Sequence, residues 1–179
     1  MPAMAVIAYR SGAMADVAGV SIFLMFLMST LYHAMEHESR HKKIFKILDH
    51  IFIYIAIAGS YTPIALRVIG GWKAVAILAV QWGMVLVGIF YKSLARKSMP
   101  KMSMAMYLVM GWTVALILPS FYRNASPALF WLVFAGGICY SLGAIFYAMR
   151  SVRYHHMIWH LFVFAGAGCH YVGIGGFLY

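Results

Sequence analysis

Long apolar runs alternate with short polar or turn-rich breaks along the whole chain. Six of these runs come close to the roughly 20 residues that a helix needs to cross a hydrocarbon core about 30 Å thick. They lie at residues 13–34, 49–68, 73–91, 104–121, 127–149 and 156–179. All six are predicted to be helices, because backbone groups in lipid must be hydrogen-bonded within their own segment and the runs are too long for barrel strands. The pattern therefore predicts an all-α integral membrane protein, with a six-helix bundle as a single transmembrane domain over residues 1–179.

The composition agrees with this interpretation. Hydrophobic residues make up 64% of the chain and charged residues only 10%, with a mean hydropathy of +0.84. Such values are typical of integral membrane proteins. The formal net charge of +10 would suit a nucleic-acid partner, but the basic residues form no compact patch or tail, and no glycine-rich phosphate loop follows a strand. We therefore expect membrane lipid, and no nucleic acid, as the partner.

The basic residues instead indicate the topology, because they collect in alternate breaks. Ten lie on one side of the predicted bundle, at Arg40, Lys42, Lys43, Lys46, Lys92, Arg96, Lys97, Lys101, Arg150 and Arg153. Four lie on the other side, at Arg10, Arg67, Lys73 and Arg123. By the positive-inside rule the first set is cytoplasmic, so both termini should lie outside. This topology predicts a multi-pass protein of the cell membrane, which in a bacterium is the inner membrane.

Polar residues interrupt the apolar runs at one predicted depth. The first run approaches the cytoplasmic side at Ser29 and His33, the second begins there with Asp49, and the sixth begins there with His156 and His160. Ionisable groups inside a membrane are costly and tend to face a bundle interior or a functional site. We therefore expect these five side chains to converge from three helices.

The spacing of the histidines indicates a metal site. Side chains at i and i+4 share a helix face, which pairs His156 with His160 and Ser29 with His33. Two imidazoles one turn apart can bind one ion, and His33 would supply a third ligand. Three protein ligands leave a position open for water or substrate, as in catalytic zinc sites. The sequence thus predicts zinc as the cofactor, bound by His33, His156 and His160.

Asp49 and Ser29 are the candidate catalytic residues beside this metal. The Asp49 carboxylate could orient a ligand histidine or accept a proton from a water that the metal activates. Ser29 could donate a hydrogen bond to that water or to a developing oxyanion. The alternative for Asp49 is a structural role as a cap of exposed amides, since it lies at the expected start of a helix.

Two further histidines are left open. His50 follows Asp49 on a different helix face and is a secondary candidate. His170 lies about 15 Å deeper than His160 along the same helix, too far to bind the same ion. We expect it to line a cavity above the site or to bond a neighbouring helix.

Four stretches of the chain, taken in order, resemble the bacterial hemolysin III proteins. These belong with the progestin and adipoQ receptor superfamily and more distantly resemble the alkaline ceramidases. The matching stretches are Ser29-Thr-Leu-Tyr-His33, Leu48-Asp49-His50 leading into Ile57-Ala-Gly-Ser-Tyr-Thr-Pro63, Tyr107-Leu-Val-Met-Gly-Trp112, and Tyr154-His-His156-Met-Ile-Trp-His160-Leu-Phe-Val-Phe-Ala-Gly166 with His170.

The resemblance implies a zinc ion on His33, His156 and His160, with Asp49 and Ser29 close by. It also implies hydrolysis of a lipid amide such as ceramide in the receptor relatives, whereas the bacterial name refers to a cytolytic or pore-forming property. Members of the family usually have seven spans. We therefore expect this chain to resemble a seven-span bundle that lacks its first helix, and such a protein would end outside, in agreement with the charge pattern.

Three functions remain open from the sequence. The first is an intramembrane zinc-dependent hydrolase of a lipid amide or ester. The second is a channel or cytolysin, which needs a continuous polar pathway, whereas the polar residues here are concentrated at one end. The third is a receptor or sensor with purely structural zinc, which would require four protein ligands.

Overall fold

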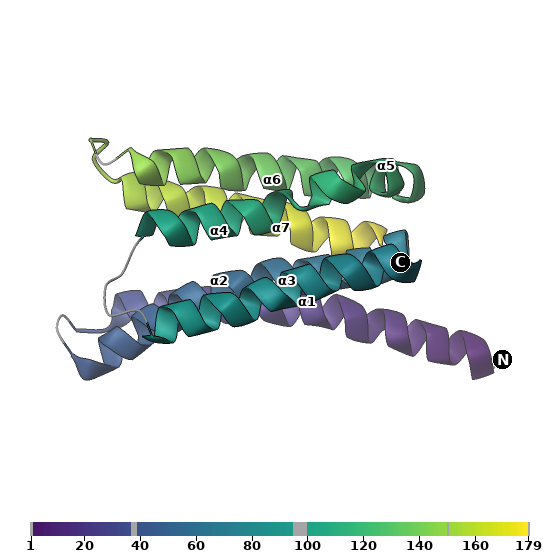
Figure 1. The fold of residues 1–179 in the computed structure, drawn as a ribbon, viewed down its shortest axis with the longest axis horizontal. Coiled ribbons are helices and arrows are strands. Elements are labelled where there is room, and N and C mark those ends of the chain that lie inside the picture. Colours follow the sequence, from purple (N-terminus) through teal and green to yellow (C-terminus); the bar gives the residue numbers. More distant parts are fainter. Residues whose placement is uncertain (1, 37–38, 95–99, 150, 179) are drawn as a thin grey trace.

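The computed structural model describes residues 2–36, 39–94, 100–149 and 151–178, arranged as an elongated helical bundle (Figure 1). The elements are helix α1 (Pro2–Ala34), α2 (Arg40–Ile64), a π-helical segment η1 (Ala65–Ile69), α3 (Gly71–Leu94), α4 (Pro100–Trp112), α5 (Val114–Asn124), α6 (Pro127–Ala148) and α7 (His155–Phe177). Serine side chains cap two of the helices, because the Oγ atoms of Ser39 and Ser126 accept hydrogen bonds from backbone amides in the first turns of α2 and α6.

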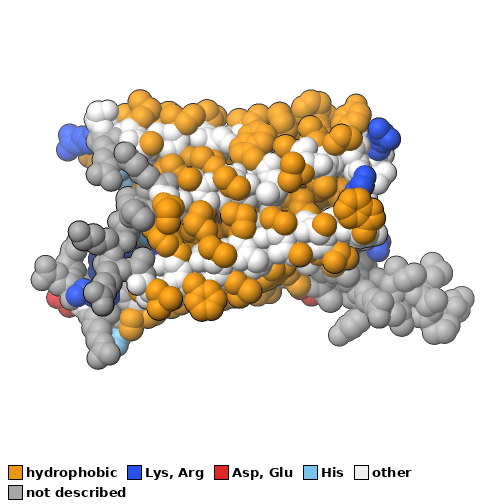
Figure 2. All heavy atoms as spheres, viewed as in Figure 1, with side chains coloured by type: hydrophobic (Ala, Val, Ile, Leu, Met, Phe, Trp, Pro, Cys, Tyr) orange, Lys and Arg blue, Asp and Glu red, His pale blue; other side chains and the backbone are white. Residues whose placement is uncertain are grey.

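The predicted all-α membrane fold is confirmed. In the described part of the chain, six stretches are long and apolar enough to cross a membrane: Asp16–Ala34, His41–Ile69, Gly71–Leu94, Met102–Asn124, Pro127–Ala148 and His155–Phe177. Figure 2 shows the apolar side chains covering the sides of the bundle, with the visible lysine and arginine side chains near its two ends. This distribution is what a lipid environment requires of a helical bundle.

The fourth stretch contains a break that the sequence pattern did not predict, since it comprises α4 and α5 rather than one helix. Side chains of two other helices bond the backbone there. Gln81 Nε2 donates to the carbonyl of Met110 over 2.9 Å. The Tyr61 hydroxyl donates to the carbonyl of Gly111 (2.6 Å) and accepts from the amide of Val114 (2.8 Å). Because hydrocarbon offers no water, these side chains take the place of missing helical bonds.

Glycines allow the helices that carry the histidines to pack closely. Helix α6 packs along α7, and α1 packs along α2, which also contacts α3, α4 and α7. A Cβ atom on Gly136 of α6 would lie 2.5 Å from His170 Nε2 and 3.1 Å from the carbonyl oxygen of Gly166, both on α7. A Cβ atom on Gly59 of α2 would similarly overlap Ser21 of α1. Small residues at helix interfaces are a common way for membrane helices to approach each other.

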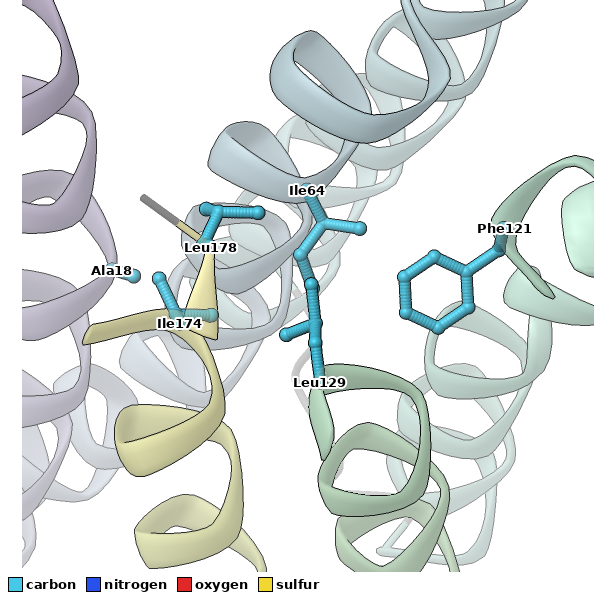
Figure 3. Close-up of a cluster of buried hydrophobic side chains, with 6 residues drawn as sticks. All are labelled: Ala18, Ile64, Phe121, Leu129, Ile174 and Leu178. Carbon is cyan, nitrogen blue, oxygen red and sulfur yellow. The ribbon is translucent and has the colours of Figure 1, made fainter. Parts of the chain in front are cut away.

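Apolar side chains close the bundle at the end remote from the histidines. They come from α1, α2, α5, α6 and α7 and meet in the cluster of Figure 3, which consists of Ala18, Ile64, Phe121, Leu129, Ile174 and Leu178. Ala18 lies about 22 Å along α1 from His33. The interior of the bundle is therefore apolar at one end, and the other end carries the residues that the sequence predicted to be functional.

Candidate metal centre

The three predicted ligand histidines lie at the same end of the bundle. His33 is in the last turn of α1, while His156 and His160 occupy the first two turns of α7. The end of α1 and the start of α7 lie at the same end of the bundle in Figure 1. Tyr154, just before α7, adopts a left-handed conformation with φ of 66°, so the chain turns sharply before the helix that carries two of the histidines.

The ring nitrogens of these histidines converge on one point. His156 Nε2 lies 3.4 Å from His33 Nε2 and 3.1 Å from His160 Nε2. All three nitrogens lie within 4.8 Å of one another. Two nitrogens on one tetrahedral zinc ion, each at about 2.0–2.1 Å, are about 3.3 Å apart. The spacing in this protein is thus close to what a zinc ion would need.

The donor set also fits a cation chemically. A neutral imidazole carries its proton on one nitrogen and a lone pair on the other, so three nitrogens at these distances either share protons or direct lone pairs at one another. A divalent cation removes that conflict. Among the described residues, the cluster contains no fourth histidine, cysteine, aspartate or glutamate. A metal held by these three residues would keep a position for water or substrate.

Asp49 and Ser29 lie beside the cluster. Asp49 is only 9% exposed, and its carboxylate has the Ser29 side chain as a hydrogen-bond partner and His33 as a neighbour. The structural alternative for Asp49 is wrong, because α2 already begins at Arg40 and is capped by Ser39. A buried carboxylate in the third turn of a membrane helix requires another explanation, and its position next to His33 provides one.

The other two histidines lie outside the cluster. His50 Nδ1 lies 2.7 Å from the carbonyl oxygen of Lys46, one turn earlier in α2, and 3.7 Å from Asp49 Oδ2. His170 Nε2 lies 3.2 Å from the carbonyl oxygen of Val133 on α6, and its ring also borders the central cavity. Both roles expected for His170, lining a cavity and bonding a neighbouring helix, are therefore present.

A cavity of about 500 Å³ runs inside the bundle from this cluster. Its polar end is bordered by Ser29, Asp49 and the histidines of α7, and it extends to Ile64 and Phe121 of the apolar cluster in Figure 3. Its volume lies in the range of about 300–1,000 Å³ that is typical of small-molecule sites. Most of the lining between its ends is apolar, so the arrangement suits an amphiphile with its polar group near the histidines.

Sequence reasoning missed other polar side chains at this end. Tyr32, Lys46, Tyr107 and Tyr147 also line the cavity, and the ring centroid of Tyr147 lies 5.7 Å from that of His156. Tyrosines and lysines are common near membrane interfaces, so residue type alone does not distinguish these cavity residues from ordinary interface residues. Helical register offers the only local signal, since Lys46 precedes Asp49 by three residues and therefore shares its helix face.

Known proteins with similar sequences fit this description. The chain is 42% identical over 149 residues to the hemolysin-3 homolog of Bacillus subtilis (strain 168), covering 83% of this chain and 70% of that protein. It is 41% identical over 151 residues to hemolysin-3 of Bacillus cereus, covering 84% and 68%. It is 31% identical over 167 residues to the monocyte to macrophage differentiation factor of Homo sapiens, covering 90% and 68%.

No solved structure shows a significant match to this chain. The model of the family described as haemolysin-III related matches residues 3–171, which include all three histidines of the cluster together with Ser29 and Asp49. The ordered motifs that resembled hemolysin III are thus accompanied by similarity over nearly the whole chain. The protein therefore belongs to the haemolysin-III related family, within the progestin and adipoQ receptor superfamily.

Proposed function

We propose that this protein is an intramembrane zinc-dependent hydrolase that cleaves an amide or ester bond of a membrane lipid. One observation carries the proposal: three imidazole nitrogens lie within 4.8 Å of one another, and two of them belong to histidines that line the polar end of an apolar cavity. An acyl chain would lie among the apolar side chains of the cavity. The bond to be cleaved would then lie near the histidines, where the polar residues are concentrated.

The residues of the site divide the chemistry among them. Zinc held by His33, His156 and His160 would supply Lewis acidity for the attack of water on a carbonyl carbon. Asp49, the only carboxylate among the described residues that line the cavity, is placed to accept the proton that the attacking water releases and to return it to the amine or alcohol that leaves when the C–N or C–O bond breaks. Ser29, as the hydrogen-bond partner of Asp49, holds the orientation of that carboxylate.

The two other functions have less support. The names of the bacterial relatives refer to hemolysis, but a pore needs a continuous polar pathway, and the cavity extends into the apolar cluster of Figure 3. A sensor with structural zinc needs a fourth protein ligand, and the described residues supply three. The hydrolase is the function that uses the open coordination position.

Elemental analysis of the purified protein tests the metal site first. Wild type in detergent should contain about one zinc per chain, and His160→Ala should lose it because one of three ligands is gone. His41→Ala is the matched control, since His41 is exposed in the first turn of α2 and belongs neither to the cluster nor to the cavity lining. A well-folded wild type without zinc, even after zinc is supplied, would contradict the metal site and with it the hydrolase.

Turnover is tested separately on the zinc-loaded protein. Wild type reconstituted in vesicles should release fatty acid from a ceramide-like amide or a related acyl ester. His160→Ala should release none above background, and His41→Ala, at an exposed histidine outside the cavity lining, should match wild type. If zinc is bound but no lipid amide or ester is cleaved, the ion has a structural or sensing role and the hydrolase proposal fails.

A further inference from the structure

Two lysine side chains lie at the polar end of the cavity. Lys46 of α2 lines the cavity itself and is the only lysine or arginine among the described residues that do so. Lys92, in the last turn of α3, is half-buried and has Lys46 and Asp49 as its charged neighbours. Two separate helices therefore bring positive charge to the same place as the candidate metal centre.

The register of α2 sets the order of these groups along the cavity. Lys46 precedes Asp49 by three residues and His50 by four, so its side chain neighbours both of them on α2. Side chains in a helix lean toward its N-terminus, which for α2 is the open, polar end of the bundle. The Lys46 side chain thus leans away from Asp49 toward the end of the bundle where α2 begins. The ring of His50 bonds the Lys46 carbonyl and not its ammonium.

The positive charge of the two lysines, Lys46 and Lys92, has no salt-bridge partner among the residues that the structure describes. Asp49, the nearby acid, already has Ser29 and His33 as neighbours. Lys42, which lies outside the cavity lining, has a hydrogen-bond partner on the protein, since its Nζ donates to the carbonyl of Met35 over 2.8 Å. Repulsion between two adjacent ammonium groups falls when an anion binds between them.

We propose that the cavity binds a phosphate-bearing lipid, whose phosphate contacts Lys46 and Lys92 and whose acyl chain lies in the apolar part of the cavity. The positive-inside rule explains why lysines are common on this side. It does not explain why one lines the cavity and a second is half-buried near Lys46 and Asp49. Lysine is a common ligand of phosphate. If the protein is a hydrolase as proposed, this lipid is its substrate class, and that part of the proposal rests on the proposed function. Binding of the lipid itself requires no hydrolysis.

Two probes with the same acyl chain test the head-group preference. Palmitoyl lysophosphatidic acid and monopalmitoylglycerol differ only in a phosphate against a hydroxyl group. The affinity of each lipid is measured by its displacement of a neutral fluorescent acyl probe from the protein in phosphatidylcholine nanodiscs. Wild type should bind the phosphate lipid about tenfold more tightly, as two favourable charge contacts allow. The ratio should fall to about one in Lys46→Gln/Lys92→Gln. It should persist in Lys43→Gln/Arg153→Gln, which removes the same charge from two exposed positions on the same side.

Several outcomes would overturn the proposal. They are equal affinity of wild type for the two lipids, a ratio that survives in Lys46→Gln/Lys92→Gln, and an equal loss of the ratio in the surface control. Displacement of lysophosphatidic acid by millimolar inorganic phosphate would show that free phosphate, not a lipid, is the ligand. If the double variant does not fold, the single variants Lys46→Gln and Lys92→Gln should each lower the ratio about threefold.

His160→Ala separates this proposal from the hydrolase. The variant should keep the preference for the phosphate lipid, because the lysines are not metal ligands. Loss of the preference in this variant would place the phosphate on the metal centre and refute the role of the lysines. A preserved preference in a protein that cleaves no lipid would refute only the proposed hydrolysis.

Discussion

Alanine in place of Gly136 tests whether α6 and α7 approach as closely as the structure shows. The added Cβ atom would lie 2.5 Å from His170 Nε2 and 3.1 Å from the carbonyl oxygen of Gly166. The imidazole would have to move, and its contact with the carbonyl of Val133 would be lost. Because backbone lies on the other side of the new methyl group, moving His170 alone does not relieve the crowding.

The expected loss of stability follows from these contacts. Overpacking in a well-packed interior costs about 1–3 kcal/mol, and a lost hydrogen bond between membrane helices adds about 0.6 kcal/mol. The higher helix propensity of alanine offsets about 1 kcal/mol. We therefore expect Gly136→Ala to lower the free energy of unfolding by about 0.6–2.6 kcal/mol, or the melting temperature by about 1–10 °C.

Thermal unfolding of the purified protein in detergent measures this effect, and the adjacent residue provides its control. A Cβ atom on Gly137 meets nothing within 4 Å, so Gly137→Ala should be neutral or more stable by up to about 1 kcal/mol. If Gly136→Ala is as stable as Gly137→Ala, the close approach of α6 and α7 is wrong. The placement of α7, which carries two of the three histidines, would then need revision.

Two further predictions concern the site and the broken fourth span. Asp49→Asn should retain zinc, because Asp49 is not among the clustered ligands, while lipid hydrolysis falls about 100-fold or more; loss of the metal in elemental analysis would make Asp49 a ligand instead. Tyr61→Phe should destabilise the protein by about 1–3 kcal/mol in the same thermal assay, because the hydroxyl that bonds the carbonyl of Gly111 and the amide of Val114 is removed. Tyr122→Phe, at an exposed side chain of α5, should have no effect, and equal effects of the two variants would contradict the bonding at the break.

The location of the candidate site was largely predictable from the sequence. Alternating charge in the breaks placed His33, Asp49 and His156 at the same end of the bundle, and the spacing of four residues placed His156 and His160 on one helix face. The structure brings the three histidines together, with all three ring nitrogens within 4.8 Å of one another. Their binding of zinc, the hydrolysis of a lipid and the orientation in the membrane remain predictions.

Two features of the helices were not predictable in this way. The second apolar run starts at residue 49, but α2 begins at Arg40 because the Ser39 side chain caps it and charged residues can continue a helix beyond the apolar layer. Hydropathy therefore located the membrane segment and misplaced the start of the helix. The break between α4 and α5 has no local signal in an apolar run, since Gln81 and Tyr61 of other helices bond the backbone there.

The sequence by itself determined the class of fold, the number of long apolar helices and the residues that share a helix face. These properties depend on the transfer of apolar segments out of water and on the 3.6-residue repeat of the helix, both of which are local. Only the tertiary structure decided that Lys46 and Lys92 approach each other, that Asp49 contacts Ser29 and that a cavity of about 500 Å³ remains between the helices. Such features depend on the distance between packed helices. Contacts between residues far apart in the chain, such as Gly136 against His170, set that distance.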